Sequence, residues 1–119
     1  MRRLALLLLA LPLAACSQGR QTMDVPGGDP AHGKHVIQHV GCGGCHAIPG
    51  IDDASGRVAP SLAGYARSKF IAHALTNTLP NLVRWIENPQ RVAPGTRMPS
   101  LGVKPADARD IAAYLYRKT

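Results

Sequence analysis

The sequence predicts an all-α domain with an amphipathic helix near each end. Apolar residues recur at helical spacing near both ends of the region 29–119. The chain is rich in turn residues, with 12 glycines and 10 prolines, but has one tryptophan, three tyrosines and one phenylalanine in 119 residues. A core made of protein alone would be thin, so we expect another group to help fill it.

The first 15 residues are predicted to be a signal peptide. Two arginines follow Met1, and residues 4–15 form an uncharged, mostly apolar run. This run is shorter than the roughly 20 residues that a membrane-spanning helix needs. It ends in Leu-Ala-Ala followed by Cys16, which resembles a bacterial lipobox, so Cys16 is the expected lipidation site. The alternative is an ordinary cleavage site with an incidental cysteine.

The segment after the signal peptide is polar and Gly-rich. We expect residues 16–28 to be a lipidated N-terminus and flexible tether, and residues 29–119 to be the folded domain. Acyl chains, at about 0.8 kcal/mol per buried methylene, would hold the domain on a bilayer surface. The expected location is the periplasmic side of a bacterial membrane, and a soluble periplasmic protein is the alternative.

The formal charge of +7 falls to +5 when Arg2 and Arg3 leave with the signal peptide. The remaining cations are scattered and do not interleave with aromatic residues, so nucleic acid is not an expected partner. They suit docking to an acidic partner or an anionic lipid, although a merely soluble surface explains them equally well.

The first helix is predicted to begin at Pro30. Asp29 is a favourable N-cap, and proline is common at the first helical position. Val36, Ile37 and Val40 then form an apolar stripe on one face of this helix.

The last helix is predicted to begin at Pro105. Asp107 lies in its first turn, where the helix dipole favours an acid, and Ala108, Ile111 and Leu115 share one face. Between the two terminal helices, the stretch 68–76 also has a helical pattern.

The strongest signal is the sequence Cys42-Gly43-Gly44-Cys45-His46, which has the Cys-x-x-Cys-His spacing of a covalent c-type haem site. Cys42 and Cys45 can each form a thioether with one porphyrin vinyl group. His46 is then the expected proximal iron ligand, with its second ring nitrogen donating to a backbone carbonyl. A redox dithiol, a structural zinc site and a plain disulfide are the alternatives.

The opposite face of the iron calls for a second ligand, and a methionine thioether raises the reduction potential. Met1 lies in the signal peptide and Met23 in the tether, which leaves Met98, in a turn-rich segment suited to a loop around the ring. A methionine that merely fills a gap is the alternative reading, and His73 is the rival ligand.

These segments resemble a class I monohaem cytochrome c over about residues 29–117. Besides the haem motif, the resemblance rests on the start of the first helix at 29–34, a proximal-type loop at 59–64, the Trp-Ile-Glu-Asn-Pro sequence at 85–89 and the last helix at 108–115. The family fold implies that the terminal helices cross, and Gly33 is the residue expected to permit their close approach.

The resemblance also implies roles for five residues. Pro60 would offer its carbonyl oxygen to His46, Leu62 would press on the proximal face of the ring, and Trp85 would pack on the distal side. Thr96 and Arg67 are candidate contacts to the haem propionates. The sequence departs from the longer mitochondrial pattern between residues 65 and 80, where it has no tryptophan, and an aliphatic residue, Ile37, replaces an aromatic of the first helix.

The resemblance implies a monomeric one-electron carrier of a bacterial respiratory chain, not an enzyme. The stretch 75–89 looks most like cytochrome domains that serve haem-copper oxidases, so a membrane oxidase or a dehydrogenase is the expected partner. The alternative is a haem enzyme or gas-binding sensor in which Met98 is displaced. His32, His35 and His39 lie at helical spacing, and we expect them to form a solvated face without a metal, because no carboxylate joins them in the sequence.

Overall fold

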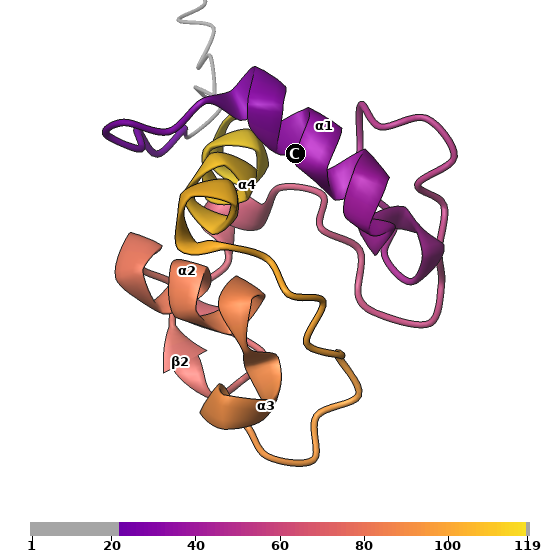
Figure 1. Ribbon diagram of the computed structural model, residues 1–119, viewed down its shortest axis with the longest axis vertical. Coiled ribbons are helices and arrows are strands. Elements are labelled where there is room, and N and C mark those ends of the chain that lie inside the picture. The colour runs from indigo at the N-terminus through magenta and orange to yellow at the C-terminus, as the bar shows by residue number, and fades with distance from the viewer. Residues whose placement is uncertain (1–21, 119) are drawn as a thin grey trace, which may run out of the picture.

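The computed structural model describes residues 22–118. Two longer helices, α1 (Pro30–Val40) and α4 (Pro105–Lys118), lie against each other, and α2 (Leu79–Glu87) packs on the other side of α4 (Figure 1). The shorter elements are η1 (Cys42–Gly44), η2 (Tyr65–Arg67), β1 (Phe70–Ile71), β2 (Leu75–Thr76) and α3 (Pro89–Val92). The all-α prediction is therefore confirmed, apart from one minimal hairpin. No helix within 22–118 is long and apolar enough to cross a membrane.

Helix α1 begins where the sequence predicts. The Asp29 carboxylate accepts hydrogen bonds from the backbone N–H groups of Ala31 and His32, at 2.8 and 3.1 Å. These are two of the donors that a helix N-terminus leaves without a partner. At the other end Gly41 takes the left-handed conformation, with φ of 85°, and its N–H donates to the Ile37 carbonyl. This turn leads the chain out of α1 and directly into the Cys-x-x-Cys-His segment.

The crossing of α1 and α4 depends on Gly33. A Cβ atom at this position would overlap the backbone carbonyl of Asp110 and lie 2.9 Å from the backbone nitrogen of Ile111. The two helix backbones therefore touch where glycine offers no side chain. Ile37 and Ile111 are nearly fully buried near this contact, with 1 % and 3 % of their surfaces exposed. The expected helix crossing and the role of Gly33 are confirmed.

Helix α4 is the centre of the core. Its residues 111–116 are all buried, including the aromatic rings of Tyr114 and Tyr116. The Tyr116 hydroxyl donates to Asn77 Oδ1 at 2.8 Å, and the Tyr114 hydroxyl donates to the Pro49 carbonyl, also at 2.8 Å. These two bonds tie α4 to loops from different parts of the chain while satisfying the polar ends of buried rings.

The packed region starts earlier than the expected boundary at Asp29. Val25 is 6 % exposed and belongs to the core, and Met23 packs against it. The Met23 N–H also donates to the Tyr116 carbonyl at 3.4 Å. Residues 22–28, assigned above to a flexible tether, are thus held on the domain, while the signal peptide and Cys16 lie outside the described residues.

The expected helix over 68–76 is wrong, because this segment is a hairpin. Phe70 pairs with Thr76 and Ile71 with Leu75, and the turn between them places Ala72 and His73 at positive φ. The Asn77 side chain closes the loop by donating to the carbonyls of Tyr65 and Ser68, at 3.1 and 2.9 Å. These long-range bonds and the burial of Ile71 outweigh the local helical preference.

Side-chain caps stabilise the starts of α2 and α3, the two helices before the Met98 segment. The Thr78 hydroxyl accepts from the Asn81 N–H at the start of α2, and the Asn88 side chain accepts from the Arg91 N–H at the start of α3. Leu82, Trp85 and Ile86 form the buried face of α2. Trp85, the one tryptophan of the sequence, therefore lies on the buried side of α2.

Candidate cofactor site

The Cys-x-x-Cys-His segment folds as one tight turn after α1. The N–H groups of Cys45 and His46 both donate to the Cys42 carbonyl, at 3.2 and 3.0 Å. A second chain segment packs closely on this turn, since the Gly56 N–H donates to the Gly43 carbonyl at 3.0 Å and a Cβ at either glycine would meet backbone. Gly43 of the motif and Gly56 of the packed segment thus permit the close approach, whereas Gly44 has open space around it.

Both motif thiols are free, so the disulfide alternative does not describe this structure. Burial raises the pKa of the Cys42 thiol, and the nearby Cys45 adds to this effect. Among residues 22–118, no group of three metal-type ligands includes either cysteine or His46, which argues against the zinc alternative. The two thiols are therefore available for another attachment.

The His46 ring is fixed by the loop that follows the motif. Its Nδ1 lies 2.7 Å from the Pro60 carbonyl oxygen, which accepts a hydrogen bond from Nδ1–H, so Nε2 is left to bind a metal. Backbone bonds hold this loop in place: the Ala59 N–H donates to the Cys45 carbonyl, and the Leu62 N–H donates to the Ala47 carbonyl. The contact that the resemblance implied between Pro60 and His46 is present.

Two adjoining cavities open beside the motif. The larger has a volume of about 650 Å³, within the range of cofactor sites, and the smaller reaches into the core between α1, α2 and α4. Cys42 lines the smaller cavity and Cys45 the larger one. The residues that line both are His46, Leu62, Tyr65, Trp85 and Met98. The predicted ligands, the two cysteines and the two predicted packing residues are therefore brought to one place.

The Met98 segment is held by a residue that the sequence reasoning missed. The Gln90 side-chain amide donates to the carbonyls of Thr96 and Met98, at 2.6 and 3.1 Å, and its Oε1 accepts from the Gly95 N–H at 3.3 Å. The Gln90 side chain thus connects three backbone groups of this loop. A glutamine in a short helix gives no sequence signal for this role, because its partners are backbone groups.

The two candidate propionate contacts differ in their placement. Thr96 lines the larger cavity, whereas Arg67 is not among the residues that line either one. Arg67 is exposed, and its guanidinium lies against Gly64. The larger cavity instead carries Arg97 and Lys69, which the sequence reasoning did not assign as contacts.

Tyr65 and His73 also belong to the cavity wall. Burial raises the pKa of Tyr65 to about 12, and its ring stacks on that of Tyr116 at a centroid distance of 6.4 Å. The hairpin places the exposed His73 in the wall of the larger cavity. This rival ligand therefore lies beside the site.

These residues fit a covalent haem. The walls of the smaller cavity are almost entirely apolar, two thiols border the site, and one imidazole presents a free nitrogen to it. Such a combination suits a large apolar ring with a central metal and a few polar edge groups.

Comparison with known proteins agrees with this fit. The family model for cytochrome c matches residues 30–117. The chain belongs to the cytochrome c family. It is 32 % identical over 99 residues to cytochrome c2 of Rhodomicrobium vannielii, covering 74 % of this chain and 78 % of that protein. It is 31 % identical over 107 residues to cytochrome c of Chlamydomonas reinhardtii, covering 81 % and 95 %.

A third relative is a longer protein. The chain is 33 % identical over 84 residues to cytochrome c oxidase subunit 2 of Alkalihalophilus pseudofirmus, which covers 70 % of this chain but 24 % of that subunit. The chain thus matches about a quarter of the length of this relative. As a class I monohaem cytochrome c, it carries haem c covalently through Cys42 and Cys45 and is a haem electron carrier.

Proposed function

We propose that the protein is a lipid-anchored, one-electron carrier of a bacterial respiratory chain, with His46 and Met98 as the two axial ligands. The observation that carries this ligand pair is that His46 and Met98 both line the two cavities, each of which is also bordered by one attachment cysteine. The haem, when bound, supplies the exchange between ferric and ferrous iron. Because both ligands would come from the chain, no position remains for a substrate.

The surrounding residues support the same proposal. Pro60 would keep His46 in the tautomer that presents Nε2, and Gln90 would keep Met98 at the cavity with three hydrogen bonds to its loop. Leu62 and Trp85 would exclude water on the two sides of the ring. A site that changes little between oxidation states favours rapid electron exchange.

The rim of the larger cavity is a suitable docking face. Val58 and Phe70 line this cavity yet are 66 % and 59 % exposed, which is unusual for apolar side chains of this size. Lys69 and Arg97 lie beside the same opening. We propose that an acidic partner docks here, either a membrane haem-copper oxidase or a dehydrogenase. The likeness to oxidase subunit 2 supports the first partner.

The position of His73 in the wall of the larger cavity favours a second candidate function. If this imidazole served as an acid–base group, or if Met98 were displaced, the site would suit a haem enzyme or a gas-binding sensor. The two candidates differ in whether methionine occupies the axial position in the resting ferric protein.

Met98→Ala is the variant that separates them. We expect it to lose the weak red absorption band that arises from sulfur-to-iron charge transfer, because alanine offers no thioether. The measurement is the absorption spectrum of the purified ferric protein. His73→Ala is the matched control and should keep the band. A band that persists in Met98→Ala, or is absent from the unaltered protein, would contradict the proposed ligand set.

The anchor has a separate test. Cys16 lies outside the described residues, and the support for lipidation is the sequence that precedes it. Cys16→Ser should move the protein from the membrane fraction to the soluble periplasmic fraction, because the acyl chains would no longer be attached. Gln18→Ser, two residues further along the chain, should stay with the membrane. Unchanged membrane association of Cys16→Ser would refute the lipid anchor.

A further inference from the structure

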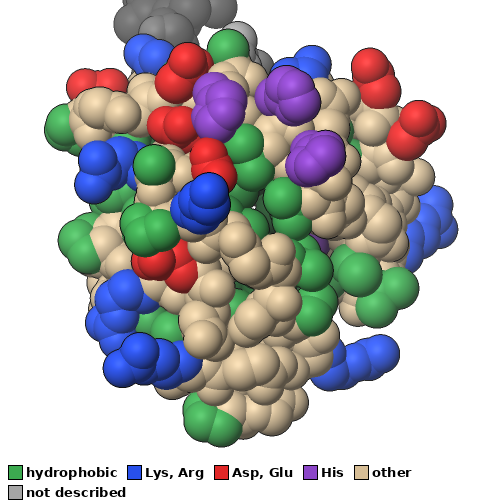
Figure 2. Space-filling view, viewed as in Figure 1, with side chains coloured by type: hydrophobic (Ala, Val, Ile, Leu, Met, Phe, Trp, Pro, Cys, Tyr) green, Lys and Arg blue, Asp and Glu red, His purple; other side chains and the backbone are tan. Residues whose placement is uncertain are grey.

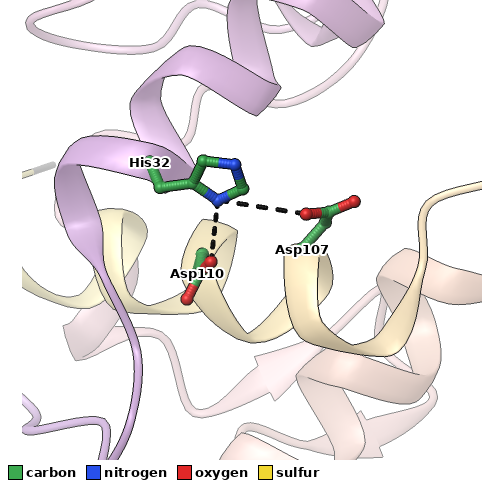
Figure 3. A group of neighbouring side chains, drawn as sticks. All are labelled: His32, Asp107 and Asp110. Carbon is green, nitrogen blue, oxygen red and sulfur yellow. Dashed lines mark hydrogen bonds and ion pairs between the residues drawn. The ribbon is translucent and has the colours of Figure 1, made fainter.

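A cluster of three possible metal ligands lies where α1 and α4 cross, formed by His32, Asp107 and Asp110 (Figure 3). His32 Nδ1 lies 2.8 Å from an Asp110 carboxylate oxygen and 3.9 Å from an Asp107 oxygen. One ligand atom from each residue lies within 4.8 Å of the other two. The sequence-based expectation that no carboxylate joins these histidines is therefore wrong for His32, because the carboxylates come from the far end of the chain.

The spacing of these atoms suits a tetrahedral metal ion. Ligands about 2.0–2.1 Å from zinc are separated from one another by roughly 3.3 Å along the edge of a tetrahedron. The two distances from His32 Nδ1 lie on either side of this value. The His32 and Asp107 side chains are 49 % and 34 % exposed, which leaves them room to adjust these distances.

The chain already orients one of the ligands. Asp110 Oδ1 accepts the backbone N–H of Asp29 at 2.8 Å, which leaves Oδ2 directed toward His32. The Asp110 side chain is 16 % exposed, against 49 % for His32, so its carboxylate is held rather than free in solvent. Carboxylates that bind metals are commonly fixed by such an additional hydrogen bond.

The charge balance at the cluster also favours a cation. Across residues 22–118, the ion-pair partner found for Asp107 and Asp110 is His32, which carries charge only when protonated. Figure 2 shows acidic side chains beside a histidine on the upper part of the face in view, among scattered lysine and arginine side chains. A divalent ion would neutralise both carboxylates at once.

The other two histidines of α1 form a separate pair. The rings of His35 and His39 meet edge to face with centroids 6.5 Å apart, and both residues are exposed. Within residues 22–118, no carboxylate joins this pair to make a group of three ligands, so it offers two nitrogen ligands alone. The cluster at His32 offers three ligands from two helices and is the better zinc site, as an ion there would bridge α1 and α4.

We propose that His32, Asp107 and Asp110 form a surface site for Zn²⁺, with water completing the coordination. In the metal-free site the proton lies on Nδ1, because the Asp110 carboxylate can only accept. Zinc therefore binds the other neutral tautomer: Nδ1 gives its proton to water, Nε2 takes one from water, and the hydrogen bond is replaced by metal bonds from Nδ1 and from Asp110. The ion links the first turn of α1 to the first two turns of α4. This site is separate from the haem site and does not depend on the proposed axial ligands.

The test is zinc titration of the chelator-treated haem protein by isothermal calorimetry, followed by thermal unfolding with and without zinc. We expect one zinc ion per chain and a higher unfolding temperature when it is bound. His32→Gln and Asp107→Asn should each weaken zinc binding by about tenfold or more, which is the scale found even for residues that only orient a ligand. Asp107→Asn keeps the bond between His32 and Asp110, so its zinc-free unfolding temperature should change little.

His35→Gln is the matched control on the same helix and should bind zinc as the unaltered protein does. Zinc affinity that is unchanged in His32→Gln would overturn the proposal. So would a loss confined to His35→Gln, which would assign the ion to the pair formed with His39. Absence of saturable binding at one ion per chain would overturn it as well.

Discussion

Gly33→Ala is expected to destabilise the folded protein by about 2–3 kcal/mol, although alanine is the better helix former. In an unconstrained helix, this change would stabilise by about 1 kcal/mol. Here the added methyl group would overlap the Asp110 carbonyl, and overpacking against backbone typically costs 1–3 kcal/mol or more. The clash outweighs the helical preference because neither backbone can yield without separating α1 from α4.

Thermal unfolding of the haem protein, followed by far-ultraviolet circular dichroism, measures this effect. A loss of this size corresponds to a decrease of roughly 10–20 °C in the unfolding temperature for a domain of this length. Gln38→Ala is the control, since Gln38 is exposed on the same helix and should change stability by less than about 0.5 kcal/mol. An unfolding temperature that rises in Gly33→Ala would show that the helices do not touch at this point.

Trp85→Ala is expected to cost about 3–5 kcal/mol, the usual range for removing a large buried aromatic side chain. Trp85 is 8 % exposed and lines both cavities. Removing the indole therefore enlarges the cavity beside the haem, and neighbouring side chains do not collapse to fill the space. The added space would also admit water. We therefore expect both lower stability and easier binding of small external ligands such as imidazole.

Chemical denaturation and imidazole titration of the ferric protein measure the two effects of Trp85→Ala. Leu101→Ala is the control, because Leu101 is a large apolar residue that is 44 % exposed and lies in the wall of neither cavity. It should leave both measurements nearly unchanged. A Trp85→Ala protein as stable as Leu101→Ala would mean that the indole does not pack in the core.

Local signals in the sequence were sufficient to predict the two terminal helices. Asp29 and Pro30 determine the start of α1 through backbone chemistry within a few residues, and Gly41 ends it in the left-handed conformation. The Cys-x-x-Cys-His spacing likewise implies its chemistry without knowledge of the remaining chain. The approach of Pro60 to His46, by contrast, was available from family resemblance and not from any local pattern.

The features that sequence reasoning missed depend on contacts between distant residues. The hairpin at 70–76 needs a turn with Ala72 and His73 at positive φ, which is uncommon for any residue other than glycine, and the side chain of Asn77 closes it. Gln90 acts on backbone carbonyls, so its own identity says little about its partners. The carboxylates beside His32 are 75 and 78 residues away in the chain.

The packing of Met23 and Val25 on the core limits how far an anchored domain could travel. From Cys16 to Met23 the chain advances seven residues, which span at most about 25 Å when fully extended. A domain of about 90 residues is itself roughly 30 Å across. With a lipid on Cys16, the domain could rotate beside the bilayer but could not swing between partners set far apart. Electron delivery would then proceed by diffusion in two dimensions, at a rate set by the lateral mobility of the lipid and by the density of partners in the same membrane.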